Sequence, residues 1–304
     1  MLREGLLYYR ISKLPICMAM AAASHTALAS NDKSIVLEPS SNWHLDYADE
    51  RCAIGRSFGS GDEKTVAFFQ QAEPSDSLHW VVGGWVADRI DTKFEVQFGP
   101  GFEQYEMRSP MGLKVDDFGT AVRGTGFKKF EPENDLHSDA SVAEPVGLPQ
   151  LNPDEGSSIE WVEFVRGDRS YRLRLGNLEP VYKAMNACMT NLVTSWGADP
   201  DILRQRRTPP QLINPDDVRK AIQSHYPSTA SALGAQADLQ IRAMVEADGT
   251  VSKCHITGLT KADRFDSDAC VVLLQDARFE PARDLEGRPL ASFYMQRIHY
   301  RMRR

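Results

Sequence analysis

Residues 239–258 read LQIRAMVEADGTVSKCHITG, and this stretch determines the fold of the last third of the chain. Its first half places apolar residues at every second position, at Leu239, Ile241, Ala243 and Val245. Alternation of this kind predicts a β-strand with one buried face and one face largely in solvent. Asp248-Gly249 predicts a tight turn because glycine adopts positive φ without strain. The stretch therefore predicts an antiparallel hairpin, with Cys254 and Ile256 on one face of the second strand.

Two short helices are predicted on either side of this hairpin. Pro215 suits a first helical turn, and the acidic residues Asp216 and Asp217 suit the positive end of a helix that runs to about Ser224. Within residues 266–277, apolar side chains recur at helical spacing, at Cys270, Leu273, Leu274 and Ala277. We therefore expect helices that cover the buried face of a small antiparallel sheet.

Six short motifs follow one another through the last third of the chain. They are Tyr226-Pro227, Asp248-Gly249-Thr250-Val251, Phe265-Asp266 with Ala269, Phe279-Glu280-Pro281-Ala282-Arg283, Gly287-Arg288-Pro289 and Ile298-His299-Tyr300. In order and approximate spacing the set resembles the TonB C-terminal domain family over about ninety residues. The resemblance implies helices on a small antiparallel sheet over residues 216–304. It also implies a periplasmic role in contacting outer-membrane receptors, by pairing a strand with a short receptor segment.

On this resemblance the final strand is the candidate binding strand. We expect it to run from Phe293 to Met302, with a rim that accepts a peptide strand through main-chain hydrogen bonds. The candidate partner-binding residues are Phe293, Tyr294, Met295, Gln296, Arg297, Ile298, His299 and Tyr300. Domains of this family can exchange strands between copies, so a homodimer stays open.

Residues 30–205 are predicted to form a β-rich domain. Runs of β-branched and aromatic residues, separated by glycine, proline and Asp/Ser turns, predict strands at 34–37, 65–69, 78–82, 93–98 and 105–107. No helix between these runs is long enough for a parallel crossover, so we expect antiparallel pairing. The runs 159–165 and 171–175 flank Gly167-Asp168 and predict a hairpin. Between them and the earlier strands, the acidic, proline-bearing segment 131–157 is predicted to be a loop.

One helix is predicted to close this domain, over residues 180–196. Pro180 suits its first turn and Gly197 suits the position just past its end. Apolar residues fall on one stripe at helical spacing, at Val181, Met185, Cys188, Leu192 and Trp196. The sequence thus predicts an α+β protein, with an N-terminal β-rich domain closed by one helix and a C-terminal TonB-like domain.

Four cysteines remain after the N-terminal 29 residues, and we expect two disulfides in an exported chain. Cys52 shares a strand face with Ile54, and Cys188 lies on the apolar stripe of the predicted helix, so both point into one core. Cys254 and Cys270 likewise face one another across the hairpin and helix. A Cys52–Cys188 bond closes a long loop and stabilises by about 3–5 kcal/mol in the chain-entropy model. The alternative for each pair is two buried free thiols.

Residues 1–29 are predicted to be a secretory signal peptide. Basic residues precede an apolar run at 14–23 that is too short to span a bilayer, and Ala27-Leu28-Ala29 fits the small-x-small cleavage rule. We therefore expect a periplasmic protein that is soluble after cleavage. Membrane anchoring follows only if the signal stays uncleaved.

Residues 206–215 are predicted to be a short, stiff, proline-containing linker between the two domains. Residues 206–304 carry 15 basic and 12 acidic side chains and are therefore net positive, whereas the whole chain has a net charge of −7. The net charge thus changes from negative to positive across the linker. That net charge gives no reason to expect a nucleic-acid partner.

No sequence pattern points to catalysis, a metal or a cofactor. Beyond the predicted signal peptide the histidines are scattered, at His44, His79, His137, His225, His255 and His299, without the spacing of a metal site. Neither a Gly-x-Ser-x-Gly elbow nor a phosphate-binding glycine loop is present. We therefore expect a non-enzymatic protein with no catalytic or metal-ligating residues.

Three functions follow from these predictions. The first is an envelope protein whose last domain binds outer-membrane receptor segments by strand pairing, with a role in TonB-dependent transport. The alternative is a protein that binds an envelope ligand or the cell wall through residues 30–205, with the last domain as a docking module. The third, energy transduction through an uncleaved anchor, is disfavoured because an acidic β-rich domain replaces the long Pro/Glu/Lys-rich spacer of such proteins.

Overall fold

The computed structural model describes residues 33–48, 50–90, 93–108, 111–115, 117–127, 147–225, 232, 237–261 and 267–300. The chain divides into two units, Met1–Asp32 and Lys33–Arg304, and every described residue belongs to the second. The predicted signal peptide, residues 131–146 of the predicted acidic loop, Tyr226-Pro227 and Phe265-Asp266 lie outside the described residues.

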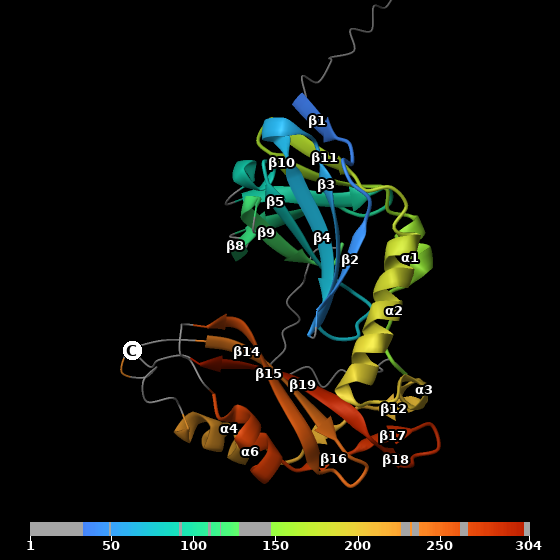
Figure 1. Cartoon of the computed structure of the whole chain (residues 1–304), viewed down its shortest axis with the longest axis vertical. Coiled ribbons are helices and arrows are strands. Elements are labelled where there is room, and N and C mark those ends of the chain that lie inside the picture. The colour runs from blue at the N-terminus through green and yellow to red at the C-terminus, as the bar shows by residue number, and fades with distance from the viewer. Residues whose placement is uncertain are drawn as a thin grey trace, which may run out of the picture. The chain divides into compact units, whose positions relative to one another are not determined.

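Six strands between residues 44 and 125 form an antiparallel sheet in the order β2-β3-β4-β5-β9-β8 (Figure 1). Its strands are β2 (His44–Ala48), β3 (Arg51–Phe58), β4 (Thr65–Gln71), β5 (His79–Gly84), β8 (Met111–Val115) and β9 (Gly119–Thr125). Two 3-10 turns, η1 (Gly61–Glu63) and η2 (Ala87–Arg89), lie between strands of this part of the chain. In β4 every second side chain is buried, as alternation requires of a strand with one face in a core.

A second sheet has five strands in the order β1-β11-β10-β6-β7. They are β1 (Lys33–Leu37), β6 (Lys93–Gly99), β7 (Tyr105–Arg108), β10 (Trp161–Arg166) and β11 (Arg169–Arg174). The predicted hairpin is present as β10 and β11. One pairing differs from the prediction: β1 runs parallel to β11. Most of the β-rich segment separates these two strands in sequence, so no short crossover helix is needed to bring them together.

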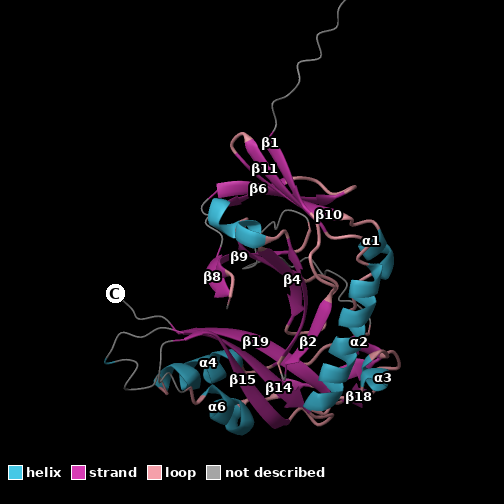
Figure 2. Cartoon of the chain, turned by 45° about the horizontal axis from the view of Figure 1, so that its top comes forward, coloured by secondary structure: helices cyan, strands magenta, loops and turns pink. Residues whose placement is uncertain are grey.

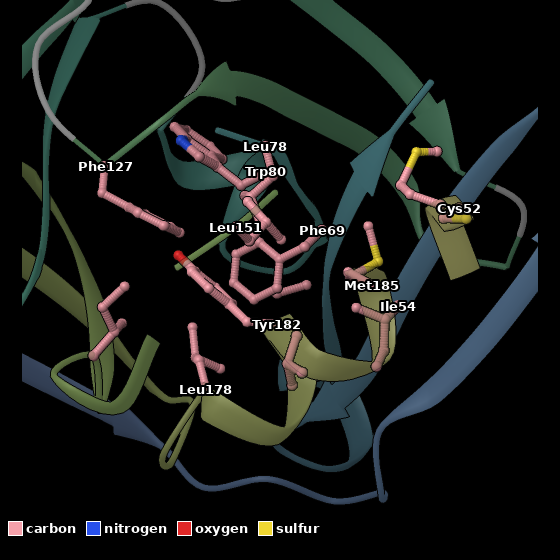
Figure 3. Packing of buried hydrophobic residues seen from close by; sticks show 14 of the residues in the cluster. Cys52, Ile54, Phe69, Leu78, Trp80, Phe127, Leu151, Leu178, Tyr182 and Met185 are labelled. Carbon is pink, nitrogen blue, oxygen red and sulfur yellow. The ribbon is translucent and has the colours of Figure 1, made fainter. Parts of the chain in front are cut away.

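The helix α2 (Glu179–Trp196) packs into the core that the two sheets share. Figure 3 shows Tyr182 and Met185 of α2 in the same cluster as Phe69, Trp80 and Phe127. The rings of Phe127 and Tyr182 stack with centroids 6.2 Å apart. Two further short helices, α1 (Pro153–Ser157) and α3 (Pro200–Leu203), precede and follow it.

The bond Cys52–Cys188 joins β3 to α2, with a Cα–Cα distance of 6.0 Å across a sequence separation of 136. Both cysteines are completely enclosed in the core. The helix is thereby covalently attached to the sheet that it covers.

Three longer strands of the last third form the sheet β15-β14-β19. They are β14 (Ala237–Val245), β15 (Val251–Lys261) and β19 (Ser292–Tyr300), all antiparallel. Figure 2 shows α4 (Pro215–Ser224) and α6 (Ala269–Asp276) on one side of these strands. Cys254 of β15 is bonded to Cys270 of α6, with a Cα–Cα distance of 5.4 Å.

The segment predicted to be a linker lies within small sheets. Its first residues form β12 (Arg206–Thr208), which pairs with β17 (Ala282–Asp284), itself paired with β18 (Pro289–Leu290). Its next residues form β13 (Gln211–Leu212), paired with β16 (Phe279–Glu280). The pairing partners lie about seventy residues further along the chain, so local composition could not show them.

The second face of the final sheet is also covered. We expected the residues that alternate with Leu239 and Ile241 to be largely solvated, but Gln240 and Met244 are only 6% and 5% exposed. Met244 and Phe293 belong to the same core cluster as α2 and the two large sheets. The protein is therefore mixed α+β, rich in strands, with few helices and several sheets among its described residues.

Candidate functional site

The candidate binding strand β19 is an edge strand. Its nine residues pair with β14 along the full register from Ser292↔Val245 to Tyr300↔Ala237. In the part of the chain that the structure describes, β19 has no strand on its other side. Half of the main-chain groups of an edge strand point away from its single neighbour, so β19 has a rim that can pair with a further strand.

Both faces of β19 are occupied by packing. Tyr294 and Ile298 pack against the cluster that α4 and α6 cover, and Phe293 and Met295 pack against the core that contains α2. The backbone rim is therefore the part of this strand that is suited to a partner. Gln296, Arg297 and His299 are the exposed side chains of β19.

The start of β19 is fixed by Phe293. Its ring lies edge-on to Trp196, with centroids 5.4 Å apart, and the guanidinium of Arg206 lies 5.8 Å from the ring centroid. Arg206 is buried and donates through Nη2 to the carbonyl of Gly147 at 3.1 Å and through Nη1 to Ser292 Oγ at 3.4 Å. These contacts hold the strand rigidly where it enters the sheet.

A groove of about 540 Å³ borders the first half of β19. Four consecutive residues of the strand, Phe293 to Gln296, line it. Its other walls include Glu73, Arg206, Leu212 and five prolines, Pro74, Pro149, Pro209, Pro210 and Pro215. Proline has no backbone N–H, so at these five positions the chain cannot donate a main-chain hydrogen bond to the carbonyl groups of β19.

Two titratable groups that interact with Arg297 of β19, Glu73 in the groove and His79, have shifted pKa values. Burial raises the pKa of the Glu73 carboxyl above its ordinary value, while Arg297 and a hydrogen bond with Gln240 act in the opposite direction. Burial, together with Arg123 and Arg297, lowers the pKa of His79 to about 4. Both groups sit next to Arg297, a residue of the candidate binding strand.

The geometry brings the predicted site residues together only in part. Phe293 to Gln296 line one groove, whereas Arg297, Ile298 and His299 lie further along β19 and are not among the residues that line it. Sequence patterns did not point to Glu73, Pro74, Pro149 or Arg206. The one sequence feature that marks this wall of the groove is the proline cluster at 209, 210 and 215, and in the sequence this cluster predicts a linker.

Neither a metal site nor a membrane-spanning helix is found among the described residues. They contain no group of three or more His, Cys, Asp or Glu side chains arranged to hold a metal ion. Across the same described ranges, every helix is too short or too polar to cross a bilayer.

Among its described residues, the C-terminal part of the chain therefore combines a three-stranded sheet, two helices on one face of it and an edge strand bordered by a groove. Residues 222–302 match the family model described as Gram-negative bacterial TonB protein C-terminal. The match covers every element from β14 to β19 and falls within residues 216–304, where the motifs of the sequence predicted a domain of this family. A search of curated proteins found no match to this chain.

Proposed function

We propose that this chain is a non-enzymatic periplasmic protein that binds a protein partner by adding a strand of that partner to the rim of β19. The single observation that carries the proposal is an edge strand of nine residues that pairs only with β14 among the described residues and has a groove beside it. The match of residues 222–302 to a TonB C-terminal family supports a segment of an outer-membrane receptor as the partner.

The rim and the groove have different roles in this proposal. Main-chain hydrogen bonds along β19 supply affinity and are independent of the partner's sequence. The groove beside Phe293 to Gln296 supplies selectivity, because alternate side chains of an added strand point to the same face. The apolar walls formed by the prolines and Leu212 favour an apolar side chain of the partner at this point.

A pair of proline substitutions tests the proposal. The adjacent residues Gln296 and Arg297 direct their amides to opposite sides of β19, one to β14 and one to the rim. Of Gln296→Pro and Arg297→Pro, we expect one to lower the melting temperature by breaking the ladder with β14. The other should keep the fold and lose binding, because only the outward amide is removed.

Binding is measured by fluorescence titration with synthetic peptides from the periplasm-facing ends of outer-membrane receptors of the same organism. Arg297→Ala is the control, since it removes the side chain and keeps the amide, and it should bind like the unmodified chain. A folded proline variant that binds these peptides with unchanged affinity contradicts the proposal.

A further inference from the structure

A second hollow, of about 400 Å³, lies on the outer face of the five-stranded sheet, away from β19. The side chains that shape it come from β1, β10, β11 and the segments beside them: Val36, Glu160, Trp161, Arg172, Arg174 and Asn177. The register places Val36 opposite Arg172 and Trp161 opposite Arg174, so these four side chains share one face. The hollow is therefore built on paired strands, which hold its walls rigidly.

One wall is a stack of flat groups. The guanidinium carbon of Arg172 lies 4.1 Å from the centroid of the Trp161 ring. An added Cβ at Gly99 would come within 2.1 Å of the indole, so the ring also lies directly against this glycine. Arg172 and Gly99 thus hold the indole of Trp161 in place, and the side chain of Arg172, which is 36% exposed, also lines the hollow.

Both arginines have a carboxylate beside them. Arg172 pairs with Glu163 at 3.0 Å, and Arg174 pairs with Glu38 at 2.8 Å. The exposed Glu160 adds a further negative charge to the wall, so three carboxylates lie around two guanidinium groups. This charge pattern disfavours an anionic ligand.

The remaining polar groups offer both donors and acceptors. The Asn177 side-chain oxygen already accepts from the Glu179 amide at 2.7 Å, so its NH₂ group remains to donate. The Glu160 carboxylate can only accept, and the arginines keep further N–H groups. A hydroxyl group both donates and accepts, so a polyhydroxylated ligand matches this arrangement.

We propose that this hollow is a binding site for a neutral saccharide. Sugar hydroxyls would bond to Glu160, Asn177 and the arginine N–H groups, and the C–H face of a ring would pack on Val36 and the guanidinium of Arg172. The volume lies near the lower end of small-molecule pockets and fits roughly one or two sugar rings. The site is separate from the rim of β19 and does not depend on strand pairing there.

Chemical-shift titration of the full chain tests this proposal. The probes are the neutral trisaccharides maltotriose and tri-N-acetylchitotriose, and the anionic trigalacturonate. We expect a neutral probe to bind with a Kd of about 1 mM or tighter and to shift the indole N–H signal of Trp161.

Glu160→Gln keeps the size of the side chain and removes its charge, and it should weaken binding about ten-fold. Val36→Lys places a longer side chain at the mouth of the hollow and should abolish binding; Val36 is 43% exposed, so the fold tolerates the change. Glu103→Gln, an exposed carboxylate outside the hollow, is the matched control and should leave binding unchanged. The proposal is overturned if neither neutral probe binds, if only trigalacturonate binds, or if Glu160→Gln and Val36→Lys bind as tightly as the control.

Discussion

The ring of Trp196, the last residue of α2, lies edge-on against the ring of Phe293 near the start of β19, with centroids 5.4 Å apart. The guanidinium carbon of Arg242, on the neighbouring strand β14, lies 4.1 Å from the centroid of the Trp196 ring. Trp196 and Phe293 are only 5% and 8% exposed. The final sheet therefore cannot leave the β-rich part of the chain without exposing both aromatic side chains.

Phe293→Ala tests this contact. We expect it to lower the free energy of unfolding by about 3–5 kcal/mol, because a buried ring is removed and a cavity is left. We also expect the unmodified chain to unfold in a single urea transition, followed by tryptophan fluorescence and circular dichroism. Tyr47→Ala is the control, since Tyr47 is 60% exposed, and it should change stability by less than about 0.5 kcal/mol. Two well-separated transitions in the unmodified chain would contradict the shared core.

Gly124→Ala tests the packing of the six-stranded sheet. A Cβ at Gly124 would come within 2.1 Å of the buried Trp80 ring, so the strand or the ring must shift. We expect a loss of at least about 1–3 kcal/mol, the usual cost of overpacking. Gly83→Ala in the neighbouring strand β5 is the matched control, because its nearest atoms are 3.3 and 3.4 Å away, and it should cost clearly less. Equal melting temperatures for the two variants would contradict the contact between Gly124 and the Trp80 ring.

The two disulfides should contribute unequally to stability. The Cys52–Cys188 bond has a sequence separation of 136, and the Cys254–Cys270 bond has one of 16. In the chain-entropy model the first is worth about 4–5 kcal/mol and the second about 3 kcal/mol. We expect the double Cys→Ala variant of the first pair to lose more stability in urea unfolding. Thiol titration of the native mature protein should find no free cysteine, and four free thiols there would remove the basis for an oxidising compartment.

His79 should make the protein less stable in mild acid. Its pKa is lowered from 6.5 to about 4 by burial and by Arg123 and Arg297, so the unfolded chain takes up the proton first. The neutral His79 side chain therefore makes its full contribution to the free energy of unfolding above pH 6.5. This contribution is lost as the pH falls toward 4. His79→Asn removes the titrating ring and keeps a polar atom near the Thr125 hydroxyl, which lies 2.7 Å from Nδ1. Over this window the urea midpoint of the unmodified chain should fall more steeply than that of the variant, and parallel curves would exclude the effect.

The local patterns predicted most of the elements. The apolar stripe at 180–196 corresponds to α2, and the alternation at 239–245 corresponds to all but the first two residues of β14. The cysteines expected to face one another, Cys52 with Cys188 and Cys254 with Cys270, are bonded in the structure. These predictions agree with the structure because the helix and the strand each follow from the periodicity of one segment. The cysteine pairs follow from the apolar faces of two such segments, which pack against one another.

Features that depend on distant residues could not be predicted in the same way. Nothing local to residues 206–212 shows that they pair with residues 279–284. Similarly, Gln240 and Met244 appear on the polar side of an alternating strand, and only the packing of Trp196 and Phe293 shows why that side is buried. The groove beside β19 combines Glu73, Pro149 and Pro209, which are far apart in sequence, so no motif could indicate it.

The most direct test of strand addition is amide hydrogen exchange of the full chain with and without a saturating receptor peptide. The account predicts that alternate amides of β19, those directed away from β14, exchange at least about ten-fold more slowly when the peptide is bound, while the amides of β15 are unchanged. A scrambled peptide at the same concentration should have no effect. Tight binding of the receptor peptide without added protection on β19, or with protection confined to another strand, would contradict the account.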